Sequence, residues 1–127
     1  IPRAVFSYPQ IATVGLTLSE AKVAGRSILV GQVPYSSTAK GMAMGSPLGF
    51  VRVIADQDTN ELLGATIVGP EASTLLQELI NLMYAGDRSF VPALQAIHIH
   101  PALPEVVQRA VGSLAPLNSE QVSHHRR

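Results

Sequence analysis

The feature that most constrains the fold is a pair of apolar runs joined by a short polar segment near the middle of the chain. Residues 49–55 and 61–68 are rich in valine, isoleucine and leucine, and β-branched side chains favour strands. The segment 56–60 between them reads Asp-Gln-Asp-Thr-Asn, and Asp and Asn suit a turn. The pattern predicts an antiparallel hairpin. Both runs are apolar on two faces in places, so we expect at least the central strands to be covered on both sides.

Two further strand regions are predicted before the hairpin, and the first of them consists of two runs. Residues 4–6 and 11–14 are rich in strand-forming side chains. Pro9 lies between these two runs and confines this part of the chain to a sheet edge or a bend, because proline cannot donate to a ladder. Residues 27–33 read as the next strand, which ends at Pro34.

One helix is predicted between the early strands. Thr17 is followed three residues later by Glu20, and this spacing is typical of a capping box at a helix N-terminus. The helix is expected to run to about Ala24, where Gly25 closes it because glycine readily adopts the left-handed conformation of a C-cap.

Two more helices are predicted after the hairpin. Gly69 and Pro70 are expected to start the first, with the proline in its first turn, and Gly86 to stop it. Ser89 can cap a short second helix over residues 90–96. The first helix has apolar residues at helical spacing that form one broad stripe: Ala72, Leu75, Leu76, Leu79, Ile80 and Met83.

Taken in order, the predicted elements are a strand, a helix, a strand, a hairpin, two helices, the histidine segment and a final helix. This last helix is predicted over residues 106–111, with Pro104 in its first turn. Strands adjacent in sequence, with helices set apart from them, indicate an α+β fold in which helices pack mainly on one face of an antiparallel sheet. We expect one domain over residues 1–112. Residues 113–127 lose periodicity and are expected to form a loose tail.

Composition excludes several classes of function. The chain has 127 residues and no net charge, so electrostatic binding to nucleic acid or to an anionic membrane is not expected. No apolar run is long enough to span a membrane. No cysteine is present, which excludes disulfides and a cysteine nucleophile. We expect a cytoplasmic protein and, because the chain opens with Ile-Pro-Arg, a piece of a longer polypeptide.

Candidate chemistry lies near the C-terminus, in the segment 97–105. His98 and His100 alternate with isoleucines, as in a short extended segment with one polar face. Pro101 biases His100 away from the helical region. Glu105 follows at the predicted start of a helix, where a carboxylate is favoured. A sharp turn at Pro101 would let Glu105 orient the ring of His100 and stabilise its protonated form, which is how a general base is built.

Two other interpretations of these residues remain open. A histidine near a glutamate is more often a satisfied polar pair than a catalytic one. A metal site formed by His98, His100 and Glu105 is a third interpretation, but three ligands of mixed geometry give it little support, and we predict no metal. We expect a structural role for His98.

The segment resembles the His-Pro-Thr-Leu-Ser-Glu signature of the flavin-dependent pyridine nucleotide–disulfide oxidoreductases, the family of dihydrolipoamide dehydrogenase and glutathione reductase. Here the signature stands as His100-Pro101-Ala102-Leu103-Pro104-Glu105. The preceding Ile-His-Ile makes it most similar to bacterial-type dihydrolipoamide dehydrogenases. Other similar stretches follow the family's order over residues 1–112: the opening 1–17 with Gln10 where Glu is common, the small-residue loop 35–45, and the pieces 49–51, 63–65 and 68–72.

The resemblance implies that the chain is a dimerisation domain. The parent enzyme would be a homodimer that binds FAD and NAD in preceding domains, and a 2-oxo acid dehydrogenase complex would be its further partner. The chain lacks a Gly-x-Gly-x-x-Gly turn and a cysteine pair, so we expect no cofactor and no activity on it alone. By the same resemblance, His100 and Glu105 act in the partner subunit's active site, with His100 and Pro101 near its flavin. A free-standing homodimeric module without a catalytic role and a glutathione-reductase-like enzyme are the alternatives.

Overall fold

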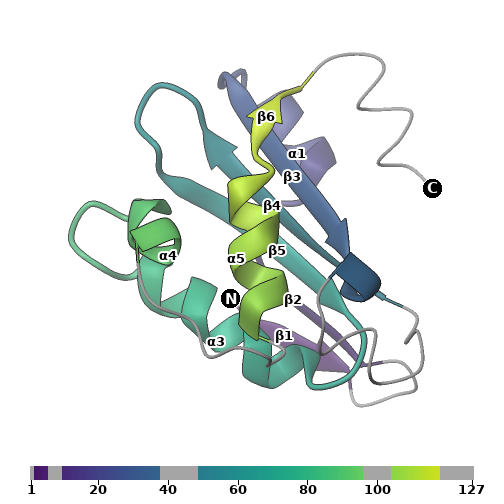
Figure 1. Cartoon of the computed structure of the whole chain (residues 1–127). Helices are drawn as coiled ribbons and strands as arrows, with labels where there is room; N and C mark the ends of the chain where they lie inside the picture. The colour runs from purple at the N-terminus through teal and green to yellow at the C-terminus, as the bar shows by residue number, and fades with distance from the viewer. Residues whose placement is uncertain (1, 6–9, 38–48, 96–103, 118–127) are drawn as a thin grey trace.

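The computed structural model describes residues 2–5, 10–37, 49–95 and 104–117. Six strands form one antiparallel sheet in the order β1-β2-β5-β4-β3-β6 (Figure 1). The strands are β1 Arg3–Val5, β2 Ile11–Gly15, β3 Ile28–Pro34, β4 Phe50–Asp56, β5 Leu62–Val68 and β6 Ala115–Pro116. The helices are α1 Leu18–Val23, α3 Ala72–Met83, α4 Val91–Gln95 and α5 Pro104–Gly112, and Tyr35–Ser37 forms the 3-10 turn η1.

The predicted hairpin is confirmed, and it forms the centre of the sheet. Strands β4 and β5 pair antiparallel from Phe50 opposite Val68. Asp56 shapes the turn, because its Oδ1 accepts hydrogen bonds from the backbone N–H groups of two turn residues at 2.7 and 3.0 Å. Asn60 has a left-handed φ of 62°, as expected for asparagine in a turn. A register shift after Ile54 then places the buried Leu63 in the smaller of the two cores.

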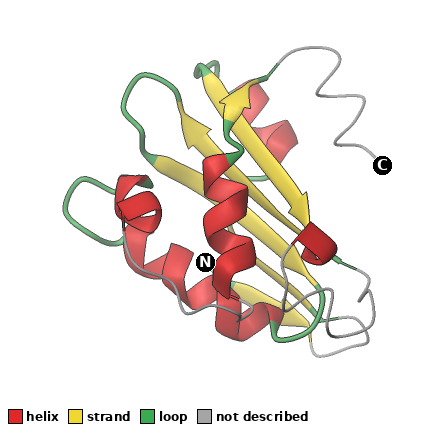
Figure 2. Cartoon of the chain, viewed as in Figure 1, coloured by secondary structure: helices red, strands yellow, loops and turns green. Residues whose placement is uncertain are grey.

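One face of the sheet is covered by α3, α4 and α5, as Figure 2 shows. The larger core lies between these helices and the sheet, and it includes Val53 and Ile67 from the central strands. The predicted stripe on α3 is confirmed: Ala72 and Leu79 are buried, and Ile80 packs partly buried against the same core. The predicted α+β fold, with helices mainly on one face, is therefore confirmed.

The second face carries a smaller core beneath α1. Ala21 of this helix packs with Val30 and Ile54 from the strands. The predicted capping box is confirmed, because Thr17 Oγ1 accepts from the backbone N–H of Glu20 at 3.2 Å and the Glu20 carboxylate accepts from the backbone N–H of Thr17 at 3.0 Å. This short helix covers one end of the second face.

The prediction that α3 starts at Gly69 and Pro70 was wrong. The helix begins at Ala72, after Glu71, whose φ of 57° is left-handed. A left-handed residue interrupts the run of helical dihedrals, so the proline lies in a turn outside the helix. The Pro70 carbonyl oxygen instead accepts a hydrogen bond from the hydroxyl of Tyr35.

The expectation of a loose tail from residue 113 was wrong for its first residues. Ala115–Pro116 forms β6, which pairs antiparallel with the first half of β3. The backbone N–H of Leu117 donates to the carbonyl oxygen of Ile28 at 3.0 Å, and its side chain packs against the smaller core. Residues 118–127 lie outside the described residues. Among the helices that the structure describes, none is long and apolar enough to cross a bilayer.

Candidate functional site

Only one of the predicted site residues falls in the described part of the chain. Glu105 is the second residue of α5 and is half-buried in its first turn, directly after Pro104. The predicted placement of this carboxylate at a helix N-terminus is therefore confirmed. His98, His100 and Pro101 lie outside the described residues, so the pairing of Glu105 with His100 stays a prediction.

The helix that carries Glu105 is fixed firmly to the sheet. Four of its nine residues are buried against β3 and β4: Val106, Val107, Ala110 and Val111. Gly31 of β3 permits this close packing, because a methyl group added there would lie 2.3 Å from the carbonyl oxygen of Ala110 and 3.0 Å from the backbone nitrogen of Leu114. The side chain of Glu105 is thus carried by a rigid element.

The helices on both sides of the histidine segment are joined to one another. Helix α4 packs against α5, and the side-chain Nε2 of Gln108 lies 3.5 Å from the carbonyl oxygen of Leu94, as a long hydrogen bond. Ser89 Oγ accepts from the backbone N–H of Val91 at 3.1 Å and caps α4, as predicted. The segment 96–103 therefore begins and ends on anchored helices.

A buried tyrosine lies in η1, directly after β3 and at the end of this strand away from β6. Tyr35 is fully buried, and its hydroxyl donates to the carbonyl oxygen of Pro70 at 2.8 Å. Burial raises the pKa of the Tyr35 hydroxyl, and the charge of Glu71 adds to this shift. The phenol is therefore a neutral donor at neutral pH, which suits a structural role. Its ring fills the space beside Gly69, where a methyl group would lie 2.8 Å from Cζ.

The sequence did not predict the packing roles of Tyr35 and Gly31. It placed Tyr35 in a small-residue loop, where the structure has the 3-10 turn η1, and it assigned the buried ring no role. Gly31 did carry a usable signal, because a glycine inside a strand pattern often marks the close approach of another backbone. No local pattern indicates that Tyr35 reaches Pro70, since 35 residues separate the two.

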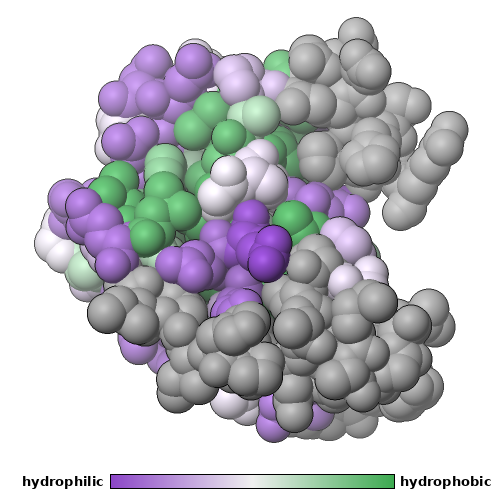
Figure 3. All heavy atoms as spheres, viewed as in Figure 1, coloured by the Kyte–Doolittle hydropathy of each residue, from purple (hydrophilic) through white to green (hydrophobic). Residues whose placement is uncertain are grey.

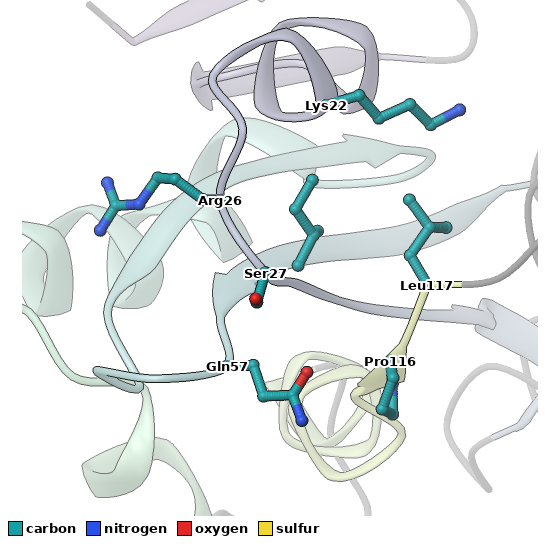
Figure 4. A pocket seen from close by; sticks show the side chains of 7 residues that line it. Lys22, Arg26, Ser27, Gln57, Pro116 and Leu117 are labelled. Carbon is teal, nitrogen blue, oxygen red and sulfur yellow. The ribbon is translucent and has the colours of Figure 1, made fainter.

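A shallow hollow lies at the opposite end of the sheet, where β6 meets β3 (Figure 4). In the close-up, Arg26 points away from the hollow, in keeping with its ion pair to Asp56 at 2.7 Å. Lys22 extends along its rim, and Gln57 lies across from it. The hollow thus contains no pair of groups suited to acid–base chemistry. Within the described ranges, no three His, Cys, Asp or Glu side chains lie close enough to hold a metal ion.

Solved structures share this fold. The flavoprotein disulfide reductase RclA from Escherichia coli, as its Cu(II) complex, superposes with a TM-score of 0.82 and 23% sequence identity, over 88% of this chain and 25% of that one. LpdA from Mycobacterium tuberculosis superposes with a TM-score of 0.78 and 22% identity, over 88% of this chain and 24% of that one. The fold is therefore one that disulfide reductases contain.

Sequence comparison identifies the family. Residues 1–111 match the dimerisation domain of the pyridine nucleotide–disulphide oxidoreductases, and the chain belongs to this family. It is 46% identical over 113 residues to dihydrolipoyl dehydrogenase 2 of Haloarcula marismortui, across 89% of this chain and 24% of that protein. It is 44% identical over 111 residues to mycothione reductase of Mycobacterium tuberculosis, across 87% of this chain and 24% of that protein. The resemblance described above is confirmed, and the chain spans about a quarter of the length of these relatives.

Proposed function

We propose that this chain is the dimerisation domain of a dihydrolipoyl dehydrogenase, which oxidises dihydrolipoyl groups with NAD as acceptor. The observation that supports this function is the 46% identity to a dihydrolipoyl dehydrogenase over 89% of the chain. The enzyme would be a cytoplasmic homodimer joined through this domain, and its further partner would be a 2-oxo acid dehydrogenase complex. FAD and NAD would bind in the rest of the polypeptide, where the flavin supplies electron transfer between the dithiol and the nicotinamide.

The chemical contribution of this domain would be an acid–base pair. His100 would accept the proton of a substrate thiol, and the resulting thiolate would attack one sulfur of the enzyme's disulfide while the other sulfur leaves as a thiolate. His100 would then return the proton to the sulfur that leaves, which becomes a thiol. Glu105 would orient the imidazole and favour its charged form. This role for Glu105 is supported by its place in the first turn of a helix that is anchored on two strands.

The test uses the full-length enzyme with His100→Gln and Glu105→Gln. We expect His100→Gln to lower kcat for dihydrolipoamide oxidation by roughly 100-fold or more, with Glu105→Gln intermediate and flavin absorbance retained in both. Arg109→Gln, on the exposed side of the same helix, is the matched control and should keep wild-type turnover. Unchanged turnover in His100→Gln would refute the assignment of the base.

Mycothione reductase is a second candidate, favoured by the 44% identity to that enzyme. The two candidates differ in substrate, which is a dithiol for the dihydrolipoyl dehydrogenase and a disulfide for the mycothione reductase. Assays of the same full-length protein with dihydrolipoamide and with mycothiol disulfide separate them, because the true substrate should give the higher kcat/KM. A protein that is inactive with both, despite bound flavin, would exclude both.

A further inference from the structure

The sequence at the start of α5 differs from the pattern that starts α1. In α1, Thr17 Oγ1 accepts from the backbone N–H of Glu20, and the Glu20 carboxylate accepts from the backbone N–H of Thr17. The matching position in α5, three residues before Glu105, is Ala102, whose side chain has no acceptor. A capping box over residues 102–105 therefore cannot form, and α5 has to begin in a different way.

Pro104 is the first residue of α5. Its ring holds φ at about −65°, which is a helical value. It also has no N–H, so the first turn contains one donor fewer that needs an acceptor. Pro104 thus supplies to α5 by covalent restraint what the hydroxyl of Thr17 supplies to α1 by a hydrogen bond.

Packing restrains the start of α5 less than it restrains the rest of the helix. Pro104 is exposed and Glu105 is half-buried, whereas Val106 and Val107 are buried. The apolar contact of α5 with β3 and β4 therefore begins one residue after the carboxylate. The backbone of Glu105 lies between a buried residue and an exposed one, and the proline ring restrains it on the exposed side.

We propose that Pro104 is a positioning residue, which holds the backbone of Glu105 in the first turn of α5 and so fixes the direction of its side chain. The direction of a helical side chain follows from the backbone dihedrals, and helix ends fray, so loss of the restraint would let the carboxylate swing. The inference rests on the proposed function, in which Glu105 orients the imidazole of His100. Proline has no group that can transfer a proton, so Pro104 acts through Glu105.

The first test measures the helix start without any substrate. Pro104→Gly in the full-length protein frees the backbone that the ring restrains. In an α-helix the N–H of residue 108 donates to the carbonyl oxygen of residue 104, so hydrogen exchange at Gln108 and Arg109 should become roughly 5-fold faster or more. Pro116→Gly, the same change at an exposed proline in β6, is the matched control and should leave this exchange unchanged. Equal exchange in the two variants would overturn the proposal.

The second test asks whether the helix start matters for turnover. Pro104→Gly should lower kcat for dihydrolipoamide oxidation by roughly 5-fold, because the carboxylate is present but less well placed. KM should stay close to the wild-type value, since the proline ring offers no group that binds a thiol. Pro116→Gly should keep both constants. Faster exchange with unchanged kcat would overturn the positioning role, whereas the acid–base pair itself is tested separately by His100→Gln.

A double variant separates positioning from a general loss of stability. Ala102→Thr combined with Pro104→Gly supplies the missing hydroxyl and with it a capping box over residues 102–105. A carboxylate has two oxygens, so Glu105 can accept from the cap and still face an imidazole. The double variant should recover most of the lost kcat and the slower exchange at Gln108. Values no better than those of Pro104→Gly alone would overturn the proposal.

Discussion

The contact between Gly31 and α5 allows a sharp test of how the sheet positions this helix. Replacing Gly31 with alanine adds one methyl group, which would meet the Ala110 carbonyl oxygen at 2.3 Å and the Ser113 Oγ at 2.7 Å. Two of the three nearest atoms belong to the backbone of residues 110–114, so rotation of a flexible side chain cannot relieve the clash. The C-terminal end of α5 must move away from β3.

The expected loss of stability in Gly31→Ala follows from this geometry. Overpacking a well-packed site by one methyl group typically destabilises a protein by about 1–3 kcal/mol, and the backbone atoms at this site favour the upper part of that range. Under the proposed function, in which Glu105 in the first turn of α5 orients His100, the displacement should also lower the turnover of the full-length enzyme while flavin stays bound.

Two glycines serve as controls for Gly31→Ala. A methyl group at Gly86 would have no neighbour within 4 Å, and one at Gly112 would meet only a leucine methyl at 3.8 Å. Gly112 ends α5, so Gly112→Ala should be neutral or stabilise by up to about 1 kcal/mol, through helix propensity. Denaturant unfolding measures all three variants, and hydrogen exchange over residues 104–112 reports loosening of the helix. If Gly31→Ala were as stable as Gly86→Ala, the proposed close packing would be refuted.

Three further predictions concern anchors elsewhere in the fold. Tyr35→Phe leaves the Pro70 carbonyl oxygen without its donor and should lower stability by about 1–3 kcal/mol in urea unfolding; no change would contradict a structural role for the phenol. The hydrogen bond from Arg26 lowers the pKa of Asp56 in the folded state, so the resulting stability is present above the unfolded-state pKa and is lost as pH falls through the lower folded-state value. Arg26→Gln should therefore be less stable than the wild type at pH 7, and the difference should shrink below about pH 4; a difference independent of pH would argue against this linkage. Thr17→Ala removes the capping box and should cost about 1 kcal/mol, with Thr17→Ser close to wild type in the same unfolding assay.

Local patterns in the sequence predicted those elements whose causes lie within a few residues. The central hairpin follows from two apolar runs and a turn rich in Asp and Asn, and the capping box of α1 needs only Thr17 and Glu20. The start of α5 at Pro104, with Glu105 in its first turn, follows in the same way. Such signals lie within short continuous stretches of the chain, so no knowledge of distant contacts is required.

Tertiary structure decided what depends on pairs far apart in the chain. The start of α3 at Ala72 rather than at Gly69 accompanies the contact between Tyr35 and Pro70, and β6 forms because β3 offers it an edge. Which side chains line up across the sheet also depends on strand order. Alternation along a strand specifies two faces but does not specify which strand lies beside it. The sequence by itself thus determined the central hairpin, the capped helix and the place of Glu105, whereas the close packing of α5 and the pairing of β6 exist only once the strands have come together.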